Sequence, residues 1–159
     1  MKCALIAASL LALAGCAAMS TPEHAAGASK EAKLAFDVTN GNPHVVNLTL
    51  ATIEMTRKQL IEQGITPHIV VTFRGDASYF TQDSLAPVKE ADRAEALLVK
   101  AKIREMRKAG AVESFEQCNI PLASRKLNPK DLMGEVKLVP NGWIALANYQ
   151  QQGYAYIVP

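Results

Sequence analysis

The run Ile69-Val70-Val71-Thr72-Phe73 decides the fold of this chain. It is a nearly continuous series of β-branched and aromatic residues, it follows Pro67, and it ends at Arg74-Gly75-Asp76. A short apolar run of this kind is typical of a strand that is covered on both faces, as the strands of parallel sheets are. We therefore place this segment inside a parallel sheet.

Strand and helix patterns alternate on both sides of this run. Before it, Lys33 to Thr39 alternates as a strand does, and Asn42-Pro43 opens a helix that Gly64 ends. After it we predict a loop or short turn at 77–87, a helix at 89–109, a strand at 112–117, a short helix to about 127, a turn at 129–132, a strand at 136–139, a helix at 141–152 and a strand at 154–158. This alternation predicts an α/β fold with a mostly parallel five-stranded sheet covered on both faces.

The helical periodicity also predicts which side chains point inward. On the first helix these are Val46, Leu50, Ile53, Leu60 and Ile61. On the second helix they are Ala94, Leu97, Leu98, Ala101 and Met106, and on the last helix Trp143, Leu146 and Ala147. Trp143 and the tyrosines of the last strand are expected in packing or subunit contacts rather than in ligand stacking.

The N-terminus has the pattern of a bacterial lipoprotein. Lys2 precedes an apolar run from Ala4 to Leu13, which is too short to span a membrane, and small residues lead to Cys16. We predict a signal peptide at 1–15, a lipidated Cys16 with a flexible tether at 16–32, and a domain at 33–159. Ala17 favours the outer membrane, with the domain facing the periplasm. An ordinary signal peptide with an incidental cysteine, or a cytoplasmic helix, is the alternative.

Length and composition fit one small domain and exclude some functions. The chain has 159 residues, a net charge of +2 and 6% aromatic residues, with no basic stripe, which argues against binding of nucleic acid. The three cysteines have neither a Cys-x-x-Cys pattern nor a metal-like spacing. Because Cys3 lies in the predicted signal peptide and Cys16 carries the predicted lipid, Cys118 is the only free thiol of the mature chain.

Four polar loops are expected to meet at the carboxyl ends of the strands, where open parallel sheets bind ligands. They are Asn40-Gly41-Asn42, Arg74-Gly75-Asp76, Cys118-Asn119 and Asn141-Gly142. From these loops we take Cys118 as the candidate catalytic residue. The candidate rim residues for a ligand are Asn40, Gly41, Arg74, Gly75, Asn119 and Gly142.

Cys118 is placed where a thiolate would be favoured. If Pro121 is the first helical residue, Cys118 lies near a helix N-terminus, whose partial positive charge stabilises a thiolate, and Arg74 lies within reach. The alternative is an inert core cysteine, because free cysteines are among the most buried residues. His44 and Cys118 are too few ligands for zinc, so we predict neither a metal nor another cofactor.

The domain resembles the DsrE/DsrF-like family, which includes the sulfur-transfer subunits of the DsrEFH and TusBCD complexes. The resemblance spans Lys33 to Pro159 and depends on the order and spacing of several segments. They are a first strand ending in Asn40-Gly41, Asn47-Leu48, the strand ending near Gly75, Ala109-Gly110-Ala111-Val112 before Cys118, Leu127, Lys130-Asp131-Leu132, Val139-Pro140-Asn141-Gly142, and the final stretch from Gln150 to Pro159.

The resemblance implies a three-layer α/β/α sandwich, a homo-trimer or homo-hexamer, and a persulfide on Cys118. Members often have a hydroxyl-bearing residue where this chain has Pro121. Two hypotheses follow. In the first, Cys118 exchanges sulfane sulfur with a donor and an acceptor, either proteins or small sulfur compounds. In the second, the domain is a non-enzymatic oligomeric module that binds a small ligand, and Cys118 is structural.

Overall fold

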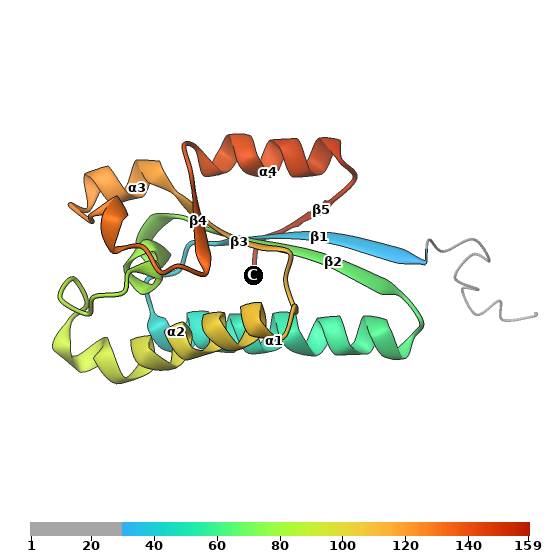
Figure 1. Ribbon diagram of the computed structural model, residues 1–159, viewed down its shortest axis with the longest axis horizontal. Coiled ribbons are helices and arrows are strands. Elements are labelled where there is room, and N and C mark those ends of the chain that lie inside the picture. Colours follow the sequence, from blue (N-terminus) through green and yellow to red (C-terminus); the bar gives the residue numbers. More distant parts are fainter. Residues whose placement is uncertain (1–29) are drawn as a thin grey trace, which may run out of the picture.

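A computed structural model describes residues 30–159, and these form the predicted sheet with helices on both faces (Figure 1). All neighbouring strands are parallel, in the order β4-β3-β2-β1-β5, so the run that ends at Phe73 is the central strand. The elements are β1 (Glu31–Val38), α1 (Pro43–Glu62), β2 (Thr66–Phe73), η1 (Gly75–Thr81), η2 (Glu90–Asp92), α2 (Arg93–Lys108), β3 (Ser114–Cys118), α3 (Asn119–Ser124), η3 (Pro129–Asp131), β4 (Val136–Val139), α4 (Gly142–Gln151) and β5 (Ala155–Ile157).

Three layers are visible in Figure 1: α1 and α2 cover one face of the sheet, and α3 and α4 lie on the other. This arrangement confirms the predicted α/β/α sandwich. Two helix starts also agree with the sequence, because Asn42 and Asn141 cap α1 and α4 through their side-chain oxygens. Both caps lie at the carboxyl ends of strands, and they position the two helices over opposite faces.

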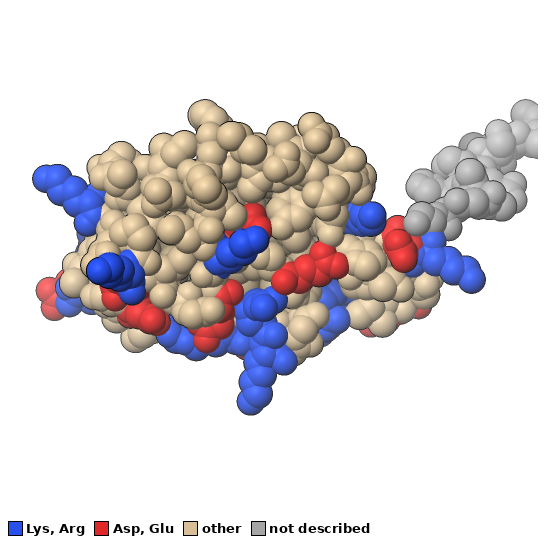
Figure 2. Space-filling model, turned by 45° about the horizontal axis from the view of Figure 1, so that its top comes forward, with Lys and Arg blue, Asp and Glu red and all other residues tan. Residues whose placement is uncertain are grey.

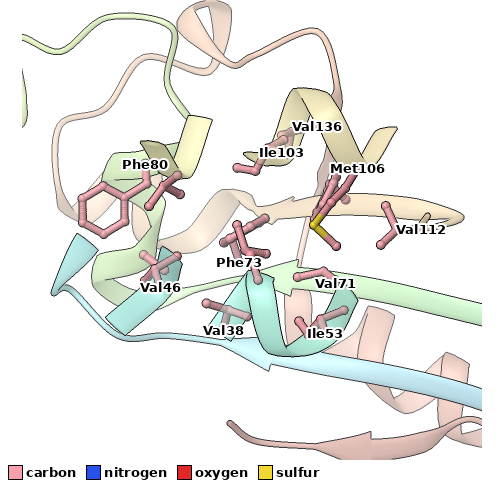
Figure 3. Packing of buried hydrophobic residues seen from close by; sticks show 14 of the residues in the cluster. Val38, Val46, Ile53, Val71, Phe73, Phe80, Ile103, Met106, Val112 and Val136 are labelled. Carbon is pink, nitrogen blue, oxygen red and sulfur yellow. The ribbon is translucent and has the colours of Figure 1, made fainter. Parts of the chain in front are cut away.

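The main hydrophobic core lies between the sheet and the pair α1 and α2 (Figure 3). Val71 and Phe73 of β2 point into it, and the ring of Phe73 lies 5.8 Å from that of Phe115 on β3. In Figure 3, Val46 and Ile53 of α1 meet Ile103 and Met106 of α2 around these strands. Burial of these side chains, at about 25 cal/mol per Å² of apolar surface, is the main force that holds α1 and α2 to the sheet.

The predicted inward face of α2 is wrong, except for Met106. Leu97 and Leu98 are 51% and 52% exposed, and Ala94 and Ala101 are exposed too. The residues buried instead are Ala96, Val99, Lys100, Ile103 and Met106. On α1, Val46, Leu50 and Ile53 are buried as predicted, whereas Leu60 is only partly buried and Ile61 is exposed, because the core ends before the last turn.

Lys100 explains why the hydrophobic periodicity of the sequence does not reveal the buried face of α2. Its ammonium donates to the backbone carbonyls of Asp83 and Ser84, so a charged side chain lies on the apolar face. Burial lowers the pKa of Lys100, and the nearby Asp83 opposes this effect. Asp83 and Ser84 belong to the segment 77–87, which we predicted as a loop or short turn. The first part of this segment is the end of the 3-10 helix η1.

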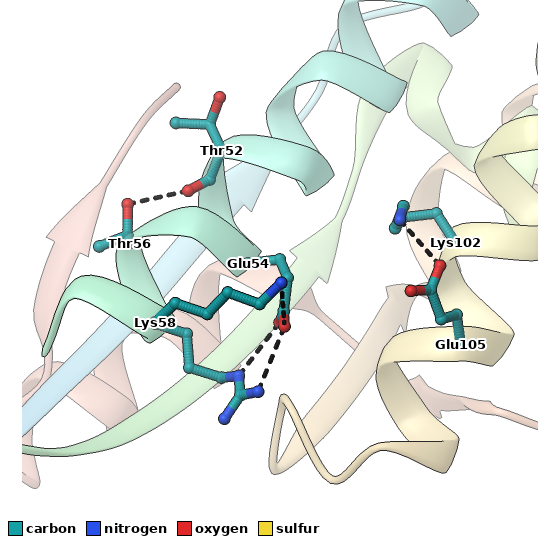
Figure 4. Close-up of polar contacts among 7 residues, drawn as sticks. Thr52, Glu54, Thr56, Lys58, Lys102 and Glu105 are labelled. Atoms are coloured by element: carbon teal, nitrogen blue, oxygen red, sulfur yellow. Dashed lines mark hydrogen bonds and ion pairs between the residues drawn. The ribbon is translucent and has the colours of Figure 1, made fainter. Parts of the chain in front are cut away.

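Charged and hydroxyl side chains of α1 and α2 form polar contacts within each helix (Figure 4). Glu54 accepts hydrogen bonds from Arg57 and forms an ion pair with Lys58, and Lys102 pairs with Glu105 on α2. Such helix-surface pairs contribute about 0.2–0.5 kcal/mol each.

The side of the sheet that α4 covers is thinner and more polar inside. Its apolar cluster consists of Ala35, Val70 and Leu146, with Tyr149 and Tyr154 packed against it. The outer surface of the molecule over α4 is, by contrast, almost free of charged residues (Figure 2). On α4, Leu146 is buried as predicted, but Trp143 and Ala147 are exposed, so their predicted packing in the protomer is wrong.

Within residues 30–159, no helix is both long enough and apolar enough to cross a bilayer. The predicted signal peptide, the lipid on Cys16 and most of the tether lie outside the described residues. The strand predicted to begin at Lys33 begins two residues earlier, at Glu31. There it pairs with Thr66 at the start of β2.

Candidate functional site

Cys118 is the last residue of β3, and it directly precedes α3. Its side chain is on the α4 face of the sheet, where Sγ accepts a hydrogen bond from the backbone N–H of Gly142 at 3.1 Å. Gly142 is the first residue of α4, so the thiol lies at the N-terminus of that ten-residue helix. The expectation that Pro121 begins the next helix is wrong, because α3 begins at Asn119. Cys118 therefore occupies the N-cap position, and α4 provides the second helix N-terminus.

Arg74, at the end of β2, lies beside this thiol. The methylenes of Arg74 and the Cβ of Cys118 flank Gly142 so closely that a Cβ added there would lie 2.7 Å from Arg74 Cδ and 3.0 Å from Cys118 Cβ. Only glycine fits between them. An N–H donor and a nearby guanidinium are the groups that stabilise a thiolate in proteins. The prediction that Arg74 comes within reach of Cys118 is confirmed by this packing.

A buried carboxylate holds Arg74 in place. Asp37 of β1 is 1% exposed, accepts from Arg74 Nε at 2.8 Å and from Arg74 Nη2, and also accepts from the hydroxyl of Tyr156 on β5 at 2.7 Å. The hydrogen bond with Asp37 raises the pKa of Arg74, and it raises the pKa of the Tyr156 hydroxyl as well. Three strands thus fix one guanidinium in a bidentate pair, the geometry in which arginine is most strongly oriented.

A pocket of about 190 Å³ opens at Cys118. Arg74 and Arg125 contribute cationic groups to its lining, and Arg125 is fixed by an ion pair with Asp76 at 2.7 Å. The Trp143 ring lies 5.2 Å from the Arg74 guanidinium, in cation–π geometry. The lining residues are Arg74, Gly75, Cys118, Ile120, Pro121, Ser124, Arg125, Asn141 and Trp143. The pocket is small, mostly apolar and bordered by two arginine side chains.

The structure brings together some of the predicted rim residues and separates others. Arg74 and Gly75 line the pocket with Cys118, and Gly142 contacts the thiol directly. Gly41 instead packs on Asp76 in a different hollow. Asn40 uses its side chain to accept from the Asn42 N–H, and Asn119 is exposed. These last three are absent from the residues that line the Cys118 pocket.

Sequence reasoning missed four residues of the site: Asp37, Tyr156, Arg125 and Trp143 in its contact with Arg74. One of them had a visible signal, because Asp37 is an acid inside a strand whose neighbours are apolar, and a buried acid needs a partner. Arg125 and Tyr156 had none, since only the folded chain brings Arg125 to Asp76 and Tyr156 to Asp37.

A metal site does not form from the histidine that was considered for it. His44 lies beside Glu95, with Nδ1 3.5 Å from a carboxylate oxygen. In the described part of the chain, no three or more His, Cys, Asp or Glu side chains gather in a way that would hold an ion.

The fold and the site define a class: a parallel α/β/α sandwich with one cysteine at the carboxyl end of an inner strand, facing two helix N-termini. The model of the DsrE/DsrF-like family matches residues 32–159, and the chain belongs to this family. An uncharacterized protein of Aquifex aeolicus (strain VF5) is 26% identical over 125 residues, which are 79% of this chain. This chain matches 55% of the length of that relative.

Two solved structures share the fold. The protein of unknown function MTH1491 from Methanobacterium thermoautotrophicum superposes with a TM-score of 0.56 at 19% identity, covering 81% of this chain and 98% of its own. The ychN protein from E. coli gives a TM-score of 0.52 at 15% identity, covering 80% and 99%. At these identities the likeness extends to the fold only.

Proposed function

We propose that this protein carries sulfane sulfur as a persulfide on Cys118. Proteins of the family typically form oligomers and act in sulfur relay. The observation that carries the proposal for this chain is the setting of Sγ: it accepts the Gly142 N–H at 3.1 Å, and Cys118 lines one pocket together with Arg74. Both groups stabilise negative charge on sulfur, and thiolate and persulfide are both anions.

The proposed reaction is a sulfur exchange without net oxidation. The Cys118 thiolate attacks the outer sulfur of a donor persulfide R–S–S⁻. A new S–S bond forms to Cys118, the donor's S–S bond breaks, and the donor leaves as the thiolate R–S⁻. The reverse step hands the sulfur to an acceptor thiolate. Rates in such exchanges depend on the attacking and the leaving thiol, as in thiol–disulfide exchange.

The shape of the pocket around Cys118 is consistent with a sulfur donor that is a small molecule or an extended protein segment. Cys118 is only 3% exposed, so a donor reaches it through the pocket and not from the open surface. Ile120, Pro121 and the Trp143 ring give this space apolar walls. A persulfide kept from bulk water is protected from side reactions with other thiols.

Location and assembly complete the proposal. We propose that Cys16 carries the lipid that anchors the protein in the cell envelope, facing the periplasm. We also propose a homo-trimer or homo-hexamer. The assembly proposal is supported by the surface over α4, where few charges occur and where Trp143 and Ile144 are 66% and 59% exposed (Figure 2). Exposed apolar patches of this kind are typical of interfaces.

Intact mass spectrometry tests the carrier function. The purified full-length protein, kept in mild detergent, is incubated with polysulfide, and Cys118→Ser is treated in parallel. We expect a mass increase of one sulfur atom that dithiothreitol removes and that the serine variant lacks. Iodoacetamide is added to a second sample to measure the reactivity of the folded thiol.

An opposite result would favour the binding module with a structural cysteine. That result is a Cys118 that stays unmodified by polysulfide and also resists iodoacetamide until the protein is unfolded. Detergent extraction from membranes, compared between the wild type and Cys16→Ser, tests the lipid anchor separately.

A further inference from the structure

A second buried acid lies on the α4 face, two residues before Cys118 on β3. Glu116 is 3% exposed. Its Oε1 accepts from the Tyr149 hydroxyl at 2.8 Å, but its Oε2 is shielded from solvent and has no hydrogen-bond partner in the described part of the chain. A buried carboxylate oxygen without a donor is unfavourable, so this position calls for a hydrogen-bond donor from outside the protomer.

The strand beside Glu116 presents the opposite charge. Lys137 of β4 is its direct cross-strand partner in the parallel register. Both side chains therefore project from the same face of the sheet. No ion pair joins them, and none joins Lys137 to any other residue among 30–159. Two opposite charges thus lie on neighbouring strands without an ion pair between them.

A groove of about 560 Å³ lies between α4 and β4 and contains both groups. This volume is within the range of small-molecule sites, about 300–1,000 Å³. Its walls add three carboxamides and several apolar side chains. The lining residues are Glu116, Lys137, Val139, Pro140, Asn141, Ile144, Ala145, Asn148, Tyr149 and Gln152.

We infer that this groove binds a free α-amino acid. The ammonium of the ligand donates to Glu116 Oε2, its carboxylate lies against the Lys137 ammonium, and an apolar side chain packs on Val139 and Ile144. A simple anion is repelled by Glu116 and a simple cation by Lys137, whereas a zwitterion satisfies both. The groove shares only Asn141 with the lining of the Cys118 pocket, and the binding inferred here does not depend on the proposed sulfur chemistry.

Isothermal titration of the full-length protein with three matched probes tests this inference. L-leucine carries both charges, 3-methylbutylamine lacks the carboxylate, and 4-methylpentanoate lacks the ammonium. We expect L-leucine to bind at least about tenfold more tightly than either of the others, which corresponds to about 1.4 kcal/mol. Equal binding of the three probes, or no binding of L-leucine, overturns the inference.

Substitutions of Glu116 and Lys137 test which charge of the ligand each residue binds. Glu116→Gln should abolish the binding of L-leucine, with the exposed Glu62→Gln as its control. Lys137→Gln should weaken L-leucine about tenfold but should not weaken 3-methylbutylamine, which loses a repulsion, with Lys130→Gln as its control. Because Lys137 is exposed, its variant should fold even if Glu116→Gln does not. L-leucine binding that is unaffected by Lys137→Gln contradicts the inference.

Two further readouts separate the alternatives. Cys118→Ser should retain L-leucine binding, so a failure of the sulfur-carrier proposal does not affect this result. Sedimentation velocity is measured on the same Glu116 and Lys137 variants. If these substitutions change the oligomeric state and no amino acid binds, a second copy fills the groove and the inference is wrong.

Discussion

The backbone N–H of Gly142 donates to Sγ of Cys118, and this bond fixes the start of α4 against the end of β3. The two residues are 24 positions apart in the sequence, and the Arg74 side chain packs against both. A single glycine therefore determines how closely a helix N-terminus and the Arg74 side chain approach Cys118.

Gly142→Ala should reduce both stability and thiol reactivity. The added Cβ would meet Arg74 Cδ at 2.7 Å and Cys118 Cβ at 3.0 Å, so α4 must move away from the thiol. Overpacking of this kind costs about 1–3 kcal/mol. We expect urea unfolding to show this loss and the rate of alkylation by iodoacetamide to fall. Gly134→Ala is the control, because nothing lies within 4 Å of a Cβ there. If both variants behave alike, the packing at Gly142 is not what limits the thiol.

The pair Asp37 and Arg74 should respond unequally to the removal of each partner. Arg74→Met leaves Asp37, which is almost fully buried, with only the Tyr156 hydroxyl as a donor, and we expect a loss of about 3–5 kcal/mol. Asp37→Asn leaves a guanidinium whose side chain is 17% exposed and can turn toward water, so the loss should be about 1–3 kcal/mol. Chemical denaturation of both variants measures the difference. A larger loss for Asp37→Asn would contradict the burial argument.

The elements of this fold were predictable where local chemistry decides them. Asn42-Pro43 and Asn141 start helices because their side chains bond the next free N–H groups, and this bond needs no distant partner. The run that ends at Phe73 was identified as an inner strand because its apolar residues leave no face for water. The position of Cys118 at the end of β3 followed from the same periodicity.

The rest depends on contacts between distant segments. Leu97 and Leu98 seemed to mark the buried face of α2, but the face that packs on α1 includes Lys100. Its apolar stem is buried, while its ammonium reaches two loop carbonyls. Asp37 and Tyr156, which fix the Arg74 side chain, come from two segments far apart in the sequence. These segments meet only when β1 and β5 pair. No periodicity within one segment reports such a pairing.

Glu113 should make stability depend on pH below about 4.5. Burial raises the pKa of this carboxyl, but hydrogen bonds with the Tyr154 hydroxyl and His68 outweigh burial and leave it below its ordinary value of 4.5. The stabilisation is therefore complete above pH 4.5 and is lost as the pH falls through the lower folded value. Because the side chain is 45% exposed, we expect an effect of less than about 1 kcal/mol.

Melting temperatures measured from pH 6 to pH 3 check this dependence. Glu113→Gln should show a shallower fall than the wild type over the acidic part of the range, whereas Glu62→Gln should follow the wild type. Parallel curves for the wild type and Glu113→Gln would mean that the bonds to Tyr154 and His68 do not persist in solution.

Trp143 should report chemistry at Cys118 by its fluorescence. It is the only tryptophan of the chain, it lines the same pocket as the thiol, and the Arg74 guanidinium lies 5.2 Å from its ring. A persulfide on Cys118 places a negative sulfur in this pocket, where it attracts Arg74 and changes the electric field at the indole.

We expect the emission of the wild type to shift or be quenched on addition of polysulfide, to recover with dithiothreitol, and to stay constant in Cys118→Ser. Stopped-flow fluorescence should give the same rate as the appearance of the sulfur adduct by mass. An adduct that forms without any change in Trp143 emission would show that the ring does not share the pocket with the reacting sulfur.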